Sequence, residues 1–304
     1  MSIASAPLSS TSRLRTYASF VRLEHTLFSL PLILAGIFSA PGPALPVRRW
    51  LLIAIAAVGA RTTAMALNRL IDRRLDALNP RTRVRELPTG RMKLAEAIAL
   101  LVVSTVAYLL ACAALGPWYL KVAVIPLAVF TIYPYLKRFT PFCHLGVGAG
   151  LALAPLAGFA AAHPDLDHWR PAVWLSVFAL FWVSGFDIIY ATLDEDFDRG
   201  HGVHSMVAWL GRERALRVSA IFHLLASVAF AITLLAVMGP AAARVSVWGA
   251  ITVASALGTA SLLFLEQRWA ENVNLAFFKA NVWVGFGVLL SVLAARMTAG
   301  GFGP

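Results

Sequence analysis

The sequence has 304 residues, of which 59% are hydrophobic and only 13% are charged, and its mean hydropathy is +0.74. This composition excludes an ordinary soluble domain of this size and favours an integral membrane protein. The formal net charge of +11 does not indicate nucleic-acid binding, because the basic residues cluster between apolar segments without any nucleic-acid-binding motif. Cys112 and Cys143 lie in apolar surroundings, which favours neither a disulfide framework nor a zinc site.

Nine apolar segments approach or exceed the ~20 residues that a helix needs to cross a bilayer. In chain order, we predict membrane-spanning helices at residues 16–40, 50–71, 94–115, 117–136, 143–162, 171–193, 216–238, 244–265 and 273–295. The first segment continues past Pro31 without a small-residue cleavage site, so we expect the amino terminus to be retained. Because no polar linker interrupts the series, residues 1–304 are predicted to form a single all-α membrane domain.

The basic residues are distributed unevenly over the two sides that these spans define. One side holds 18 of the 26 Lys and Arg residues, and the positive-inside rule places that side in the cytoplasm. We therefore expect an integral protein of the inner (cytoplasmic) membrane with a cytoplasmic amino terminus. The longest hydrophilic loops, residues 72–93 and 194–214, then also face the cytoplasm.

Seven of the 15 acidic residues lie at the ends of the second and sixth predicted spans. They are Asp72, Asp76, Asp187, Asp194, Glu195, Asp196 and Asp198. Asn68, Asp72 and Asp76 have the spacing i, i+4, i+8, and Asp187, Asp194 and Asp198 have the spacing i, i+7, i+11. Since an α-helix advances about 100° per residue, each set points to one side of its helix.

Carboxylates stacked on one face of a helix need cations to neutralise them, above all at membrane depth. A site made only of oxygen ligands favours a hard ion such as Mg2+, which completes its coordination with water and substrate phosphate. The two stripes therefore predict a metal-bound diphosphate between two acidic walls. The alternative is that the carboxylates pair with adjacent arginines at solvated helix ends. These arginines are Arg69, Arg73, Arg74 and Arg199.

Two segments resemble the signatures of the UbiA superfamily of membrane prenyltransferases. The first, NRLIDRRLDALNPRTRVRELPTG from Asn68 to Gly90, contains Asn-x3-Asp-x3-Asp followed by Asn-Pro-Arg-Thr and Leu-Pro-x-Gly. The second signature, Asp-x2-Tyr-x3-Asp-x3-Asp, is matched from Asp187 to Asp198. Further similarity in RLEHTLFSLP, YPYLKRFT and FFKANVWVG extends the resemblance over nearly the whole chain.

One departure from the usual signature follows Asn68. Many relatives have Asp at the next position, where this chain has Arg69. The spacing of the acidic residues is unaffected, and the Asn-Arg form resembles members that are similar to 4-hydroxybenzoate polyprenyltransferases. The departure does not determine the acceptor, and no motif encodes the length of the prenyl chain.

The resemblance implies nine transmembrane helices around a central cavity, with a cytoplasmic cap formed by the loops that carry the signatures. It implies a Mg2+-dependent transfer of an isoprenyl group from a polyprenyl diphosphate to an aromatic acceptor such as 4-hydroxybenzoate, through an allyl carbocation. Nucleic acid is not an expected partner. In this interpretation the active site faces the cytoplasm and the lipid bilayer surrounds the helices.

The resemblance also assigns roles to residues. Two sets of three would each bind one face of the Mg2+-diphosphate. They are Asn68, Asp72 and Asp76 in the first set, and Asp187, Asp194 and Asp198 in the second. The residues expected to be essential for catalysis are Asp72, Asp76, Asp187, Asp194 and Lys137.

Basic residues are expected to finish the neutralisation of the departing diphosphate. The candidates for direct diphosphate contact are Arg81, Lys137, Arg138 and Tyr190. Arg138 is equally explained as a basic residue at a helix end that sets the orientation in the membrane, and Tyr190 as a packing residue. By analogy with family positions, Arg22 and His25 are candidates for binding the acceptor carboxylate.

Aromatic side chains near the second signature are candidates for lining the reaction cavity, with helix packing or lipid contact as the alternative. They are Phe181, Trp182 and Phe186. The remaining histidines show no metal-ligand spacing and are expected to be loop or core residues. They are His144, His163, His168, His201, His204 and His223.

Two other functions remain open at the level of sequence. A cation or proton transporter would carry its acidic residues near the bilayer midplane, whereas here they lie at span ends with basic neighbours. Another UbiA-type enzyme, with a quinone, quinolone, haem O or chlorophyll-type acceptor, would share the metal chemistry. The Asp-Gly-x2-Ala-Arg signature of CDP-alcohol phosphotransferases is absent.

Overall fold

The computed structural model describes residues 10–22, 26–268 and 280–302. Within these ranges the chain is all helix, turn and loop, with no strand. This agrees with the all-α prediction. Eight helical segments are long and apolar enough to cross a membrane.

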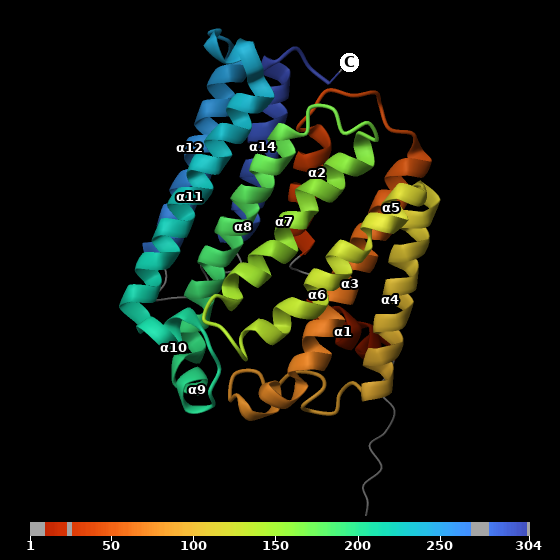
Figure 1. Ribbon diagram of the computed structural model, residues 1–304, viewed down its shortest axis with the longest axis vertical. Helices are drawn as coiled ribbons and strands as arrows, with labels where there is room; N and C mark the ends of the chain where they lie inside the picture. The colour runs from red at the N-terminus through yellow and green to blue at the C-terminus, as the bar shows by residue number, and fades with distance from the viewer. Residues whose placement is uncertain (1–9, 23–25, 269–279, 303–304) are drawn as a thin grey trace, which may run out of the picture.

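The eight segments follow one another from α3 to α14 (Figure 1). They are α3 (Val47–Leu78), α4 (Leu94–Leu115), α5 (Pro117–Val122) with α6 (Val124–Leu136), α7 (Cys143–Ala162), α8 (Arg170–Ala191) continued by η2 (Thr192–Asp194) and α9 (Glu195–Gly200), α11 (Arg212–Met238) continued by η3 (Gly239–Ala243), α12 (Val247–Arg268) and α14 (Asn281–Thr298). Three shorter helices are α1 (Ser10–Phe20), α2 (Thr26–Phe38) and α10 (Met206–Leu210).

The predicted count of nine spans is not confirmed, because the predicted span at residues 16–40 is not one helix. The helix α1 ends at Phe20, and Arg22 has a φ of 50°, in the left-handed region that interrupts a right-handed helix. The helix α2 has 13 residues, which gives a length of about 20 Å, less than the ~30 Å hydrocarbon core of a bilayer. Hydropathy alone did not predict this break.

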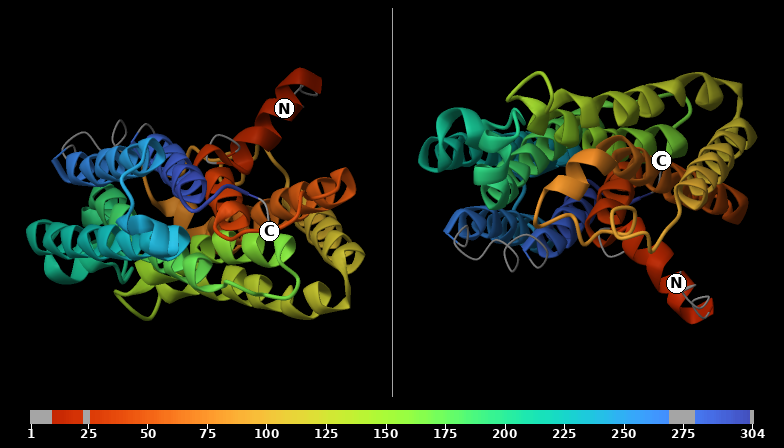
Figure 2. Two further views of the ribbon diagram at one scale, coloured as in Figure 1. Left: turned by 90° about the horizontal axis from the view of Figure 1, so that it is seen from above. Right: turned by 90° about the horizontal axis from the view of Figure 1, so that it is seen from below.

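The helices pack as a bundle in which α8 is the most buried span (Figures 1 and 2). It lies between α7 and α11, while α2 packs against α7 and α14, and α6 lies between α3 and α7. The main core contains Phe178, Trp182 and Val288, with the rings of Phe178 and Trp182 stacked 5.4 Å apart. By contrast, Val103 on α4 and Leu257 on α12 are 66% and 64% exposed, as expected for lipid-facing side chains.

Small residues let α2 and α7 approach closely. A Cβ atom added at Gly36 would lie 2.1 Å from the carbonyl oxygen of Pro155, and one added at Gly158 would lie 2.2 Å from that of Ile33. A larger side chain at either position would therefore force the two backbones apart. Such contacts between small residues are typical of helices that associate within membranes.

One end of the bundle carries the irregular segments that follow the two acidic motifs. Residues 79–93, which we call the turn segment, form a series of turns after α3, and α9 and α10 follow α8 (Figure 1). Asn79 organises the first turn, because its side-chain oxygen accepts a hydrogen bond from the backbone N–H of Arg81 at 2.8 Å. The turns therefore bring basic side chains of this segment back over the end of the bundle.

Candidate active site

A cavity of about 220 Å3, which we call the acidic cavity, lies at this end of the bundle, where α3, α6, α7, α8 and α9 meet. All six residues predicted to hold metal line it. They are Asn68, Asp72, Asp76, Asp187, Asp194 and Asp198. Lys137, Arg81 and Tyr190, predicted to contact diphosphate, line the same cavity. The fold therefore brings the two acidic motifs together from parts of the chain more than 100 residues apart.

The carboxylate of Asp72 is the most buried acidic group of the α3 wall, with 1% of the residue exposed. Its Oδ2 atom accepts hydrogen bonds from Lys137 Nζ at 2.5 Å and from Asn68 Nδ2 at 3.1 Å. Its Oδ1 atom has no hydrogen-bond donor among the described residues, and the nearest cation is Arg138 Nη2 at 3.7 Å. One buried acceptor atom is therefore left for another ligand.

A second pair on the same wall joins Asp76 to the turn segment. Arg85 Nη1 donates to Asp76 Oδ1 at 2.7 Å. Thr82 Oγ1 also donates to the backbone carbonyl of Asp76 at 3.1 Å, which fixes the turn against the end of α3. The second half of the first motif thus supplies both the closing turn and a cation for the acidic residues of its first half.

The opposite wall is built around Asp194, at the end of the 3-10 turn η2 that interrupts the regular helix. Arg81 Nε and Asn79 Nδ2 each donate to Asp194 Oδ1 at 2.8 Å, and Arg81 Nη2 donates to Oδ2. Arg81 Nη1 donates to Tyr190 Oη at 2.8 Å, and the guanidinium lies 4.7 Å from the centre of that ring. Burial would lower the pKa of Arg81, but hydrogen bonding to Asp194 and the nearby negative charges outweigh it, so the pKa is raised.

His144, which was expected to be a loop or core residue, is a member of the site. It is 3% exposed, and its Nδ1 atom lies 2.7 Å from Asp187 Oδ2. The backbone N–H of Met206 donates to His144 Nε2 at 3.2 Å, so Nε2 is the acceptor and Nδ1 carries the proton that Asp187 receives as a hydrogen bond. No local pattern could have indicated this contact, because the two residues are 43 positions apart.

The alternative of pairing with adjacent arginines holds for Glu195 but not for Asp72, Asp76 or Asp194. Arg69 is buried and donates to the backbone oxygen of Phe20 at 3.5 Å, while Arg73 donates to that of Leu70 at 2.9 Å. Arg199 pairs with Glu195 at 3.0 Å. The cations that reach Asp72, Asp76 and Asp194 come instead from the end of α6 and from the turn segment.

Several predicted residues lie elsewhere. Arg138 is not in the lining of the acidic cavity, although its Nη2 lies 3.7 Å from Asp72 Oδ1; it donates to the backbone oxygen of Ile71 at 2.9 Å and lies 4.8 Å from the ring centre of Tyr135. Arg22 is not among the described residues that line the acidic cavity, and its backbone oxygen accepts from Arg61 Nη2 at 2.9 Å. His25 lies outside the described residues.

The aromatic residues near the second motif belong to the packed interior. Trp182 is 0% exposed and its Nε1 donates to Asn281 Oδ1 at 2.8 Å, while Phe186 is 4% exposed and lies 5.9 Å from Trp182, centre to centre. Phe181 packs against the same core. The described aromatic residues that do line the acidic cavity include Tyr133, which the sequence analysis did not single out.

Comparison with known proteins supports the resemblance of the motifs. The model of the UbiA prenyltransferase family matches residues 29–298, which is most of the chain. The chain belongs to this family.

Curated relatives of this UbiA-family chain cover nearly its full length. It is 31% identical to a 4-hydroxybenzoate octaprenyltransferase of Burkholderia multivorans, covering 83% of this chain and 86% of the relative. It is 28% identical to a protein of the same name from Actinobacillus pleuropneumoniae, covering 91% and 93%.

Solved structures share the fold of this UbiA-family chain. The apo structure of a UbiA homologue from Aeropyrum pernix is 32% identical, with a TM-score of 0.77 over 87% of this chain and 95% of that one. A UbiA homologue from Archaeoglobus fulgidus, solved with GPP and Mg2+ bound, has a TM-score of 0.66 over 90% of this chain and 99% of that one. Because its sequence identity is 16%, this second likeness shows the fold alone. Family membership and eight apolar helices identify an integral membrane protein.

The donor set of the cavity fits a divalent ion that is shared with a phosphate ligand. Among the described residues, no three His, Cys, Asp or Glu side chains converge closely enough to hold an ion by themselves. However, Mg2+ is usually bound by one or two carboxylates and completes its octahedron with water and phosphate oxygens. The cavity offers carboxylates on two walls and the hydrogen-bond-free Oδ1 atom of buried Asp72. This arrangement suits a metal that arrives with its substrate.

Proposed function

We propose that this UbiA-family chain is a Mg2+-dependent aromatic prenyltransferase. It would transfer an isoprenyl group from a polyprenyl diphosphate to an aromatic acceptor such as 4-hydroxybenzoate. The observation that carries the proposal is one cavity lined by both acidic motifs together with Lys137 and Arg81. The curated relatives named 4-hydroxybenzoate octaprenyltransferase support this choice of acceptor class.

In this proposal the two acidic walls hold the ions that accompany the diphosphate. The α3 wall would contribute Asn68, Asp72 and Asp76, and the opposite wall Asp187, Asp194 and Asp198. When bound, Mg2+ would neutralise the charge that develops on the departing diphosphate. Carboxylates and amide oxygens are the ligands that this ion prefers.

The basic side chains would exchange partners when the substrate binds. Lys137 and Arg81 are hydrogen-bonded to Asp72 and Asp194. A phosphate group in the cavity would compete with these two carboxylates for the N–H groups of both cations. Tyr190 holds the Arg81 guanidinium at a fixed position for this purpose. Preorganised donors of this kind stabilise the negative charge that develops on the leaving group.

The bond changes balance without a further reactant. The allylic carbon to oxygen bond breaks and its electron pair leaves with the diphosphate. The resulting allyl cation is attacked by the acceptor ring, ortho to the phenol in a hydroxybenzoate, and loss of the ring proton to a base such as the released diphosphate restores aromaticity. Arg22 and His25 remain our candidates for binding the acceptor carboxylate, and their test is the specificity for acceptors that carry this group.

We further propose that the protein resides in the inner membrane with this cavity facing the cytoplasm. The turn segment 79–93, rich in Arg, lies at the cavity end of the bundle, and the positive-inside rule assigns such loops to the cytoplasm. A transporter would be expected to hold its carboxylates near the middle of the membrane, whereas this cavity lies at the ends of α3 and α8.

The direct test is turnover by the purified protein in detergent. Polyprenyl diphosphates of several lengths are offered with 4-hydroxybenzoate, dihydroxynaphthoates, quinolones and other phenols, and products are detected by mass spectrometry. We expect a prenylated aromatic product that forms with Mg2+ and disappears with excess EDTA. Full activity in EDTA, or no product from any combination, would contradict the proposal.

A further inference from the structure

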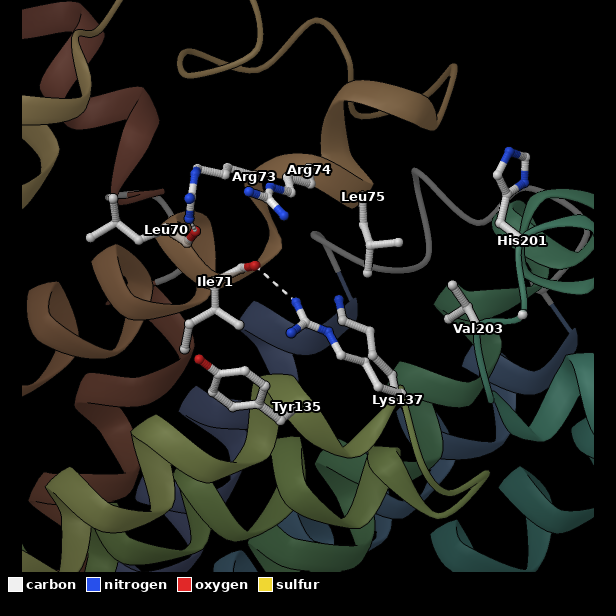
Figure 3. A pocket seen from close by; sticks show the side chains of 11 residues that line it. Leu70, Ile71, Arg73, Arg74, Leu75, Tyr135, Lys137, His201 and Val203 are labelled. Carbon is white, nitrogen blue, oxygen red and sulfur yellow. Dashed lines mark hydrogen bonds between the residues drawn. The ribbon is translucent and has the colours of Figure 1, made fainter.

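A second cavity, of about 560 Å3, is lined by the end of α3, the end of α6 and residues 201–203 (Figure 3). Four cationic side chains line it: Arg73, Arg74, Lys137 and Arg138. No acidic residue is among the described residues of its lining. In Figure 3 the two arginines from α3 lie across the cavity from Tyr135 and Lys137, which come from α6 and its end. We call this space the basic cavity.

The basic cavity carries an excess of positive charge that the protein does not neutralise. Its nearest carboxylate is that of Asp72, which Lys137 contacts at 2.5 Å and Arg138 approaches to 3.7 Å. One carboxylate thus faces two cations, and Arg73 and Arg74 add two more. Among the described residues, neither of these two arginines has a carboxylate within 4.0 Å. Unpaired cations gathered around a concave space attract an anion of matching charge.

Two of the cations are held in place. The Arg138 guanidinium is fixed between the Ile71 carbonyl oxygen, at 2.9 Å, and the Tyr135 ring. The Arg73 side chain is bound to the Leu70 carbonyl oxygen at 2.9 Å. Guanidinium groups match phosphate oxygens in geometry as well as charge. Side chains held in this way lose little freedom when they bind such a group.

The basic cavity adjoins the acidic cavity. The two share Leu75, Lys137 and Val203 in their linings. Lys137 therefore stands on the boundary, with Asp72 on one side and the arginines on the other. A phosphate group bound in the basic cavity would lie next to the cation that we assign to the catalytic diphosphate.

Apart from His201, the rest of the lining is mainly apolar, and part of it is open to the surroundings (Figure 3). Leu70 and Ile71 belong to the lining, and Tyr135 is 40% exposed. The cavity lies at the ends of helices whose outer faces are apolar and suited to lipid. This combination suits a ligand that joins a phosphate to a hydrocarbon chain.

We propose that the basic cavity is a second binding site, separate from the metal site, for the phosphate or diphosphate group of a lipid-soluble molecule. Two sources share this chemistry: the diphosphate of the prenyl donor or the diphosphate released from it, and the phosphate of an anionic phospholipid. Assignment to the prenyl donor rests on the proposed function, whereas the anion site itself does not. If the donor is the source, the site receives its diphosphate beside Lys137 before the metal site does.

The test uses the full-length protein purified in detergent with EDTA present, so that the acidic cavity holds no metal. Inorganic diphosphate is titrated by calorimetry into the wild type and into the double variant Arg73→Gln/Arg74→Gln. The matched control is Arg83→Gln/Arg214→Gln, which removes the same charge from exposed side chains outside the basic cavity. A parallel arm measures retention of phosphatidylglycerol against phosphatidylcholine in nanodiscs by native mass spectrometry.

We expect the wild type and the control to bind inorganic diphosphate, and the Arg73→Gln/Arg74→Gln variant to bind it at least about tenfold more weakly, since two guanidinium partners are lost. With the donor as source, the same variant raises KM for prenyl diphosphate and leaves kcat unchanged. If only phosphatidylglycerol is retained, and the double variant loses it, the phosphate comes from membrane lipid.

Two results would overturn the inference. The first is equal binding of both probes by the wild type and the double variant. The second is loss of diphosphate binding in Arg81→Gln but not in the double variant, which would locate the bound diphosphate in the acidic cavity. A wild type that binds diphosphate in this way but prenylates no acceptor would instead reject the proposed function and leave the anion site standing.

Discussion

Two regions of the bundle bury carboxylates, and they do so in opposite ways. In the acidic cavity, Asp72, Asp76 and Asp194 each face a Lys or Arg side chain. Between α8, α11, α12 and α14, Glu266 is 1% exposed and its Oε1 atom accepts a hydrogen bond from Asn281 Nδ2 at 2.8 Å. No Lys or Arg pairs with Glu266 among the described residues.

The surroundings of Glu266 are those of a structural hydrogen-bond network. Trp182 Nε1 fixes the Asn281 amide at 2.8 Å, and His223 Nε2 lies 3.9 Å from Glu266 Oε2. Gln267 Nε2 lies 3.0 Å from His223 Nδ1 and donates to Ser219 Oγ at 2.7 Å. These bonds join α8, α11, α12 and α14 inside the bundle, while Glu266 Oε2 and His223 Nε2 have no hydrogen-bond partner among the described residues.

The contrast separates two roles for acidic groups within a membrane protein. Carboxylates that line an open cavity, opposite cations able to change partner, are equipped to receive an ion and a phosphate. A buried carboxylate that accepts its hydrogen bond from a neutral amide, as Glu266 does from Asn281, is suited to joining helices. Since a charge at membrane depth is costly without a counter-charge, only the first arrangement is suited to ionised carboxylates.

The largest effect should follow from removing one carboxylate of the acidic cavity. We expect Asp72→Ala and Asp194→Ala each to lower kcat by roughly a thousandfold, because each removes one wall of the metal and diphosphate site. Turnover is measured by mass spectrometry, and thermal unfolding in detergent reports folding. Asp167→Ala, on an exposed loop, is the matched control. Wild-type turnover by either variant would show that the carboxylates of the acidic cavity are no more necessary for the reaction than Glu266.

Removal of the shared cation should have the next largest effect. We expect Lys137→Met to lower kcat by roughly a hundredfold, since the diphosphate loses a charged donor and Asp72 loses its counter-charge. Lys121→Met, an exposed position on α5, should leave turnover unchanged. Equal kcat values for the two variants would show that the cation facing Asp72 has no part in the reaction.

His144 should influence metal binding through Asp187. We expect His144→Gln to raise the Mg2+ concentration for half-maximal activity by about tenfold, because Asp187 loses the N–H group that orients it. His144→Asn should restore most of the affinity, because its amide N–H lies near the position of Nδ1. A merely structural His would not distinguish these two variants, so equal Mg2+ requirements would reject the positioning role.

Glu266 should show the smallest effect on turnover. We expect Glu266→Gln to keep kcat within about threefold of the wild type, since the amide oxygen can still accept from Asn281. Glu266→Ala should lower the free energy of unfolding by about 1–3 kcal/mol, because it leaves the buried Asn281 amide without an acceptor. A thousandfold loss of kcat in Glu266→Gln would show that Glu266 takes part in the reaction.

Much of the fold could be predicted from the sequence, because long apolar runs identify helices directly. The segments predicted at residues 94–115 and 143–162 match α4 and α7 to the residue. The break between α1 and α2 could not be predicted, since it depends on the backbone at Arg22 rather than on hydropathy. Asn68, Asp72 and Asp76, which their spacing places on one side of a helix, all line the acidic cavity.

The partners of those carboxylates could not be predicted, because they come from distant parts of the chain. Lys137 is 65 positions from Asp72, and Arg81 is 113 positions from Asp194. Adjacent arginines were the only pairing that the sequence offered. Periodicity also could not separate a cavity-lining ring from a packed one, and Trp182 proved to be fully buried among helices.

The central claim is that two walls hold a divalent ion only together with a diphosphate. Its most direct test measures Mn2+ retained by the purified protein, by electron paramagnetic resonance after ultrafiltration, with and without a slowly reacting prenyl thiodiphosphate. We predict that the wild type retains Mn2+ only when the thiodiphosphate is present, and that Asp72→Ala and Asp194→Ala each abolish retention. Retention without the thiodiphosphate, unchanged in Asp194→Ala, would contradict the account.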